Sequence, residues 1–150
     1  MALLDGLPAE PVERLRAIVS ILRSPGGCPW DREQTHESLR AGLLEEACEA
    51  IDAITRADDA NLREELGDLL LQVIFHADLA GERGAFTLED AAHHVCEKLV
   101  RRHPHVFGDA DASDTSAVLR QWEQFKREEK GAAASVMDGI PRALPALVRA

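Results

Sequence analysis

Two pairs of carboxylates in the middle of the chain have a spacing that could bind metal. Glu46 and Glu49 are three residues apart, as are Glu65 and Asp68, so each pair lies on one face of a predicted helix. A short turn joins the two helices, which makes them antiparallel neighbours. The cross-helix pairs Glu46 with Asp68 and Glu49 with Glu65 both have their midpoint at residue 57, inside that turn. The spacing therefore predicts a cluster of four carboxylates on facing helices.

Such a cluster has two interpretations, a solvated acidic face or a metal site. After the motif, the second helix is apolar nearly all round, from Leu66 to Phe75, and a helix of this kind is buried. Buried carboxylates without partners repel one another, and no Lys or Arg lies near in sequence on the same faces to neutralise all four. A hard divalent cation would do so, because Mg²⁺ prefers carboxylate and water oxygens. We expect an Mg²⁺ site, with Mn²⁺ as a possible substitute.

Histidine spacing disfavours a di-iron carboxylate site. That chemistry uses Glu-x-x-His from two helices of a bundle. Glu33 and His36 form the one such pair, at a helix start, while Asp90 and His93 lie on another helix. Neither histidine belongs to the carboxylate group, so a site built only from oxygen ligands fits better.

Cations and indoles that could grip a nucleotide lie later in the chain. Lys98 and Arg102 are four residues apart on one helix face, and so are Trp122 and Lys126. Each pair could be surface charge with a core tryptophan, or could bind phosphate and base together. Trp30, in a Cys-Pro-Trp-Asp loop, has the same two interpretations.

The elements that position these residues are all predicted to be helical. Helical periodicity and breakers indicate helices over about 8–23, 35–56, 61–82, 87–102 and 114–130, with Thr35 as the N-cap of the second. The segment 28–34 is expected to be a loop. Residues 131–135 read as a small-residue linker before a short tail. We expect an all-α bundle of about five helices, and one domain over residues 1–150.

The composition of the chain limits the classes of partner that it is expected to bind. The 150 residues carry 27 acidic and 17 basic side chains, a formal net charge of −10, which disfavours nucleic-acid polymers and anionic membranes. Residues 45–68 hold nine of these acids and two arginines, so the acidity is concentrated in the hairpin. The three cysteines are far apart, and no signal peptide or membrane span is recognisable. The expected location is therefore the cytoplasm.

Six motifs, in order, resemble the MazG family of nucleoside triphosphate pyrophosphohydrolases. They are Cys-Pro-Trp-Asp-Arg-Glu-Gln-Thr at 28–35, Leu-Glu-Glu-Ala-Cys-Glu at 44–49, Leu-Arg-Glu-Glu-Leu-Gly-Asp-Leu-Leu-Leu-Gln at 62–72, Lys-Leu-Val-Arg-Arg-His-Pro-His-Val-Phe at 98–107, Trp-Glu-Gln-Phe-Lys at 122–126 and Gly-Ile-Pro-Arg-Ala-Leu-Pro-Ala-Leu at 139–147. The resemblance covers about residues 12–149. After about residue 131 the tail is short relative to the family.

The resemblance implies an all-α fold, a homodimer with a tetramer left open, and Mg²⁺-dependent hydrolysis of nucleoside triphosphates to monophosphate and pyrophosphate. It implies a house-cleaning role in the nucleotide pool. Its metal ligands match Glu46, Glu49, Glu65 and Asp68, and its substrate contacts match Lys98, Arg102, Trp122 and Lys126.

For the mechanism, we expect hydrolysis between the α and β phosphates. Glu46 or Glu45 would accept the proton of the attacking water. Trp122 or Trp30 would hold the base. The alternative is a catalytically inactive helical dimer that binds a nucleotide or metal in a regulatory role.

Overall fold

The backbone is α-helical throughout the residues that the structure describes. This computed structural model describes residues 6–109 and 114–130, with side chains up to residue 125. No β-strand occurs within those ranges, so the all-α prediction is confirmed. The helices are α1 (Pro11–Arg23), α2 (Pro29–Glu33), α3 (Arg40–Arg56), α4 (Asp59–Glu82), α5 (Leu88–Arg102), α6 (Pro104–Phe107) and α7 (Thr115–Lys130). Among these helices, none is long and apolar enough to cross a membrane. The tail after residue 131, with its Gly-Ile-Pro motif, lies outside the described residues.

The chain divides into two compact units within α5. The first unit comprises Met1–His93 and the second His94–Ala150. The first contains α1 to α4 and the beginning of α5, and the second contains the rest of α5 with α6 and α7. The prediction of one domain over residues 1–150 stays a prediction.

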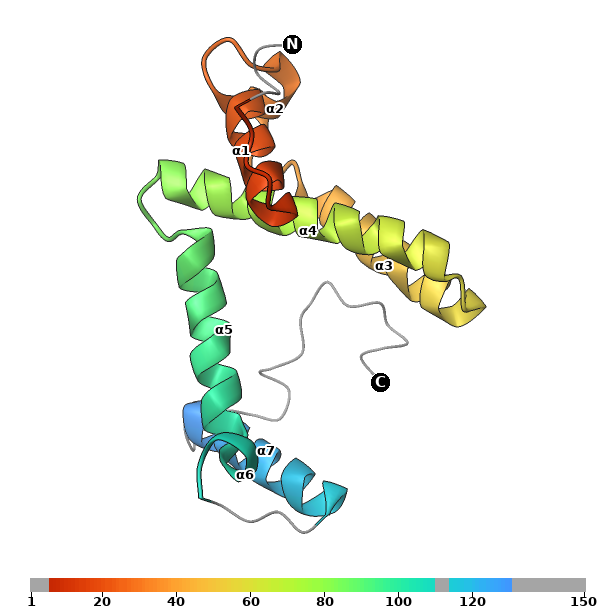
Figure 1. Cartoon of the computed structure of the whole chain (residues 1–150), viewed down its shortest axis with the longest axis vertical. Helices are drawn as coiled ribbons and strands as arrows, with labels where there is room; N and C mark the ends of the chain where they lie inside the picture. The colour runs from red at the N-terminus through yellow and green to blue at the C-terminus, as the bar shows by residue number, and fades with distance from the viewer. Residues whose placement is uncertain (1–5, 110–113, 131–150) are drawn as a thin grey trace. The chain divides into compact units, whose positions relative to one another are not determined.

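Helices α3 and α4 form an antiparallel hairpin whose turn is centred on Ala57 (Figure 1). Ala57 adopts the left-handed conformation with φ 52°, which ends α3. The Asp58 side chain then caps α4 by accepting a hydrogen bond from the backbone N–H of Asn61 at 3.1 Å. The turn therefore lies at the midpoint that the carboxylate spacing predicts.

The core of the first unit lies where α1 crosses α4 (Figure 1). Its buried cluster comprises Val19, Leu39, Ile74, Phe75 and Leu79. At the end of α1, the Arg23 side chain is only 4% exposed and reaches across to α4, where it pairs with Asp78 at 2.8 Å and Glu82 at 2.7 Å. A third bond to the Asp31 carbonyl, at 2.7 Å, ties α2 to the same arginine.

Two local predictions from the sequence are wrong. Residues around Trp30 form α2 rather than a loop, because Pro29 occupies the first helical position behind an extended Cys28. Helix α3 begins at Arg40, since Thr35 and Ser38 cap each other in a separate turn at 2.9 and 3.1 Å.

Within the first unit, helix α4 is covered on only part of its surface. Within the first unit, α4 packs against α3 and α1, which leaves Leu66 53% and Val73 48% exposed. Cys48 is also exposed on α3. The apolar pattern of α4 therefore exceeds what the first unit buries.

Candidate metal centre

The carboxylates stand on the facing sides of α3 and α4. Small buried residues of α3, Ala50 at 5% and Ala53 at 0% exposure, allow the two helices to approach closely. Glutamate side chains from both helices can then meet in the space between them. The local sequence thus combines alanines for close packing with acids at the neighbouring helix positions.

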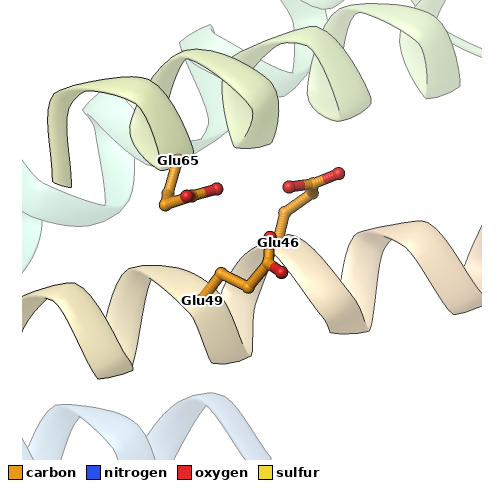
Figure 2. A group of neighbouring side chains, drawn as sticks. All are labelled: Glu46, Glu49 and Glu65. Carbon is orange, nitrogen blue, oxygen red and sulfur yellow. The ribbon is translucent and has the colours of Figure 1, made fainter. Parts of the chain in front are cut away.

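Three of the four predicted ligands come together. One carboxylate oxygen each of Glu46, Glu49 and Glu65 lies within 4.8 Å of the other two. Figure 2 shows Glu65 reaching from α4 toward Glu46 and Glu49 on α3. Glu65 is buried, with 8% of its surface exposed, whereas Glu46 is half-buried and Glu49 is exposed. The group is therefore open to solvent on the Glu49 side and closed beneath Glu65.

Asp68 and Glu45 lie beside this group rather than in it. Asp68, half-buried one turn after Glu65, is outside the three-residue group, yet its charge raises the pKa of Glu46. Glu45 is exposed and raises the pKa of both Glu46 and Glu49. Whether either residue contacts a metal or a water stays a prediction.

Electrostatics at the cluster favour a cation. Burial, followed by repulsion from Asp68, Glu49 and the other acids, raises the pKa of Glu46 above its usual value. Repulsion from Glu65, followed by burial, raises the pKa of Glu49. Carboxylates that raise one another's pKa in this way are short of positive charge. A set of carboxylate oxygens around one point fits a hard divalent cation such as Mg²⁺ or Mn²⁺.

A polar pair that the sequence analysis missed holds Glu65. The Asn61 side-chain nitrogen donates to a carboxylate oxygen of Glu65 at 2.5 Å. The Arg56 guanidinium donates to the side-chain oxygen Oδ1 of Asn61 at 2.6 Å. Asn61 and Glu65 are four residues apart on α4, a spacing that could have identified the pair. Outer contacts of this type orient ligands and tune their affinity for metal.

The predicted substrate contacts Arg102 and Trp122 meet in the second unit. The Arg102 guanidinium carbon lies 5.0 Å from the Trp122 ring centre, within cation–π range. The His103 ring contacts the same indole edge-on at 5.1 Å, and its Nδ1 donates to the Leu99 carbonyl at 2.7 Å. One face of Trp122 is therefore already occupied by a guanidinium.

The other predicted substrate-binding residues lie on three different helices. Lys98 is half-buried on α5 in the second unit. The Lys126 side chain lies outside the described residues, although its backbone is part of α7. Trp30 belongs to the first unit, on α2, and is 63% exposed. The substrate roles of all these residues stay predictions.

Comparison with known proteins places the carboxylate helices within a recognised family region. A family model described as "MazG nucleotide pyrophosphohydrolase domain" matches residues 34–107. The chain is 51% identical over 142 residues to a nucleoside triphosphate pyrophosphohydrolase of Escherichia coli K12, covering 93% of this chain and 54% of that protein. It is 53% identical over 136 residues to a Thermotoga maritima protein named nucleoside triphosphate pyrophosphohydrolase/pyrophosphatase MazG, covering 90% of this chain and 52% of that one.

A third relative covers the whole chain. It is an uncharacterized 26.1 kDa protein of Streptomyces cacaoi, 42% identical over 153 aligned positions, which are 100% of this chain and 63% of that protein. The chain thus spans about half the length of the first curated relatives that it matches.

Proposed function

We propose, since the chain belongs to the MazG family, that it hydrolyses nucleoside triphosphates to the monophosphate and pyrophosphate as a house-cleaning enzyme. The observation that carries this proposal is the meeting of Glu46, Glu49 and Glu65 across the α3–α4 hairpin. The family match contains all three residues. The names of the relatives supply the substrate class and the hydrolase activity.

Glu46, Glu49 and Glu65 would hold Mg²⁺, with Asp68 completing the carboxylate set and Mn²⁺ as a possible substitute. The cation would neutralise negative charge on the triphosphate and would lower the pKa of a bound water. Asn61 keeps the Glu65 carboxylate turned toward α3 through its 2.5 Å hydrogen bond. Glu46, whose pKa is raised, or the neighbouring Glu45, would accept the proton of the attacking water.

Lys98, Arg102 and Lys126 would stabilise negative charge on the leaving pyrophosphate. The contact with Trp122 supports this role for Arg102, because an indole face restricts where the guanidinium can lie. Since that face of Trp122 is occupied, a base would stack on the other face or on the exposed indole of Trp30.

We also propose that residues 1–150 act as one MazG-like domain. This domain would form a homodimer with a second copy of the chain. The family match crosses the boundary between His93 and His94, which supports one functional domain over both units. The exposed apolar side chains on α3 and α4, such as Ile51, Leu66 and Val73, support a partner chain. A homodimer fits these observations, with a tetramer as the alternative. The free cysteines fit a reducing compartment such as the cytoplasm.

A panel of nucleoside triphosphates with Mg²⁺ tests the activity. Release of pyrophosphate as the first product is expected, and orthophosphate as the first product would contradict the proposal. The double variant Glu49→Gln, Asp68→Asn should lose turnover while circular dichroism shows an unchanged helix content. Tryptophan quenching by nucleotide and Mg²⁺ without turnover would instead favour the inactive binding module with a regulatory role.

A further inference from the structure

Two histidines face each other at the open end of the α3–α4 hairpin, away from the turn at Ala57. His36 precedes α3, and His76 is on α4. We propose that His36 and His76 form a proton-sensitive clasp that keeps the two carboxylate-bearing helices in register and opens when either imidazole is protonated. The clasp rests on the hairpin alone, and only its effect on metal binding rests on the proposed function.

The geometry assigns one proton arrangement to the pair. The two Nδ1 atoms are 2.8 Å apart, and an Arg83 guanidinium nitrogen lies 2.8 Å from the Nε2 atom of His36. Arginine only donates hydrogen bonds, so Nε2 of His36 must accept. A neutral His36 then carries its proton on Nδ1 and donates it to Nδ1 of His76. His76 in turn carries its own proton on Nε2.

Adding a proton to either ring breaks a contact. On His76 the proton would take Nδ1, so that two N–H groups would face each other across 2.8 Å. On His36 it would take Nε2, which would point an N–H at the Arg83 guanidinium. Nε2 of His76 is buried and has no hydrogen-bond partner among the described residues, so a cationic ring there is poorly solvated. Burial, followed by His36, accordingly lowers the pKa of His76.

Among the described residues, no carboxylate contributes to the shift at His76, whose pKa is lowered by burial and then by His36. Arg83, at the end of α4, is itself a cation. From α1, Arg23 lies over Phe75 at 5.2 Å and is paired with Asp78 and Glu82. Gln72 and Leu39, from α4 and the start of α3, are uncharged. Protonation of the clasp therefore adds positive charge beside Arg83.

Between the clasp and the carboxylates, helix α4 also lies close against α3. One turn before His76, Gln72 lies against Gly42 of α3, where an added Cβ would come within 3.0 Å of the Gln72 amide nitrogen. One turn earlier again is Asp68, whose charge acts on Glu46. The eight residues from Asp68 to His76 span about 12 Å of helix. A hairpin fixed at Ala57 and at the clasp therefore has its register set on both sides of the carboxylates.

The first experiment uses the metal-free protein, so it does not depend on the activity. Nitrogen-15 NMR of the imidazoles at pH 7.5 should show the proton on Nδ1 of His36 and on Nε2 of His76. The opposite tautomer on either ring would overturn the assignment. Two variants serve the next experiments. His76→Phe keeps an aromatic ring at position 76 but removes the group that takes up the proton there. His94→Gln removes an exposed histidine of α5 and is the control for the loss of any histidine.

The pH dependence of unfolding then tests the switch. A histidine with a lowered folded pKa stabilises the fold above about pH 6.5, its unfolded value, and this stability is lost as the pH falls toward the folded value. Between pH 7.5 and 5.5, the melting temperature of the wild type should fall by roughly 2–4 °C more than that of His76→Phe. His94→Gln should behave as the wild type. Equal falls in the wild type and His76→Phe would overturn the clasp.

Binding of Mn²⁺ alone, followed by electron paramagnetic resonance, tests the link to the carboxylates. Over the same pH interval the wild type should lose about fivefold more affinity than His76→Phe, because proton competition at the glutamates is common to both. Equal losses would overturn the link. Absence of Mn²⁺ binding by both proteins at pH 7.5 would overturn the metal centre and therefore the link, while the tautomers and the melting curves still decide the clasp.

Discussion

Glu46 on α3 and Glu65 on α4 bring carboxylate oxygens within 4.8 Å of each other although they belong to different helices. Glu65 is buried and Glu46 is half-buried, so the repulsion between them is screened less than it would be on an open surface. The hairpin thus holds a local excess of negative charge that a divalent cation would relieve.

Glu65→Gln should remove the buried ligand while keeping the hydrogen bond from Asn61, since an amide oxygen still accepts. We expect Mg²⁺-dependent turnover to fall by at least about 100-fold, because changes even to outer contacts of a metal site cost 10–100-fold. Glu64→Gln, at the exposed neighbouring position, is the matched control and should retain activity. Pyrophosphate release at saturating Mg²⁺ measures both. Near-normal turnover by Glu65→Gln would remove Glu65 from the site.

Stability in the absence of metal should fall as the pH rises through the raised pKa values of Glu46 and Glu49. A carboxyl whose folded pKa is raised contributes stability below its unfolded pKa, near 4.5, and this contribution is lost as the pH rises through the folded value. Mg²⁺ should therefore raise the melting temperature at pH 7.5 and raise it less at pH 5, where protons compete.

Glu49→Gln tests whether this metal effect arises at the carboxylate group. Mg²⁺ should raise the melting temperature of this variant less than that of the wild type at pH 7.5. Thermal melts with and without Mg²⁺ at the two pH values measure the response. An equal response by the variant and the wild type would place the bound cation elsewhere on the protein.

Arg23→Met should destabilise the first unit. The arginine side chain is 4% exposed, donates to Asp78, Glu82 and the Asp31 carbonyl, and packs over the Phe75 ring. Methionine keeps much of the packing and removes the charged hydrogen bonds, each worth about 1.5–3 kcal/mol. We expect the free energy of unfolding to fall by roughly 2–4 kcal/mol. The loss is smaller than the sum of these bonds because water can hydrate the exposed Glu82 carboxylate once the arginine is replaced. Urea denaturation measures it. Arg32→Met, at an exposed arginine of α2, should change stability little; equal losses would show that Arg23 has no special role.

Trp122→Leu should raise KM for nucleoside triphosphates more than Trp122→Phe does. Phenylalanine keeps an aromatic face for the Arg102 guanidinium, whereas leucine keeps only the apolar bulk. A cation–π contact worth about 0.5–2 kcal/mol corresponds to a change in KM of roughly 2- to 30-fold. Steady-state kinetics with both variants tests this. Equal KM values would mean that Trp122 acts through packing alone.

Ala57→Gly should stabilise the hairpin. Ala57 has φ 52°, a conformation that costs an L-residue roughly 1–2 kcal/mol and that glycine adopts freely. After the greater flexibility of the unfolded chain is subtracted, we expect a gain of about 0.5–1 kcal/mol. Ala60→Gly, in the first turn of α4, should instead destabilise slightly. A melting temperature of Ala57→Gly below that of the wild type would contradict the assigned turn.

The sequence alone determined the helical fold, the hairpin and its register. Helical periodicity and breaker residues identified five long helices, and the equal spacing of Glu46, Glu49, Glu65 and Asp68 about residue 57 fixed the turn, which the structure places at Ala57. Spacing works here because an antiparallel hairpin with a short turn has few possible registers. Six motifs in order carried the resemblance that the comparisons confirm.

Tertiary structure alone decided burial and the polar contacts. The periodicity of α4 indicated burial all round, yet exposure depends on which helices pack against it, and within the first unit Leu66 and Val73 are exposed. His36 and His76 meet because the chain folds back on itself, and no local pattern indicates that one histidine faces another forty residues away. Proton positions at such a contact depend on every neighbour in three dimensions. The sequence therefore supplies the groups, and the packing decides their charge.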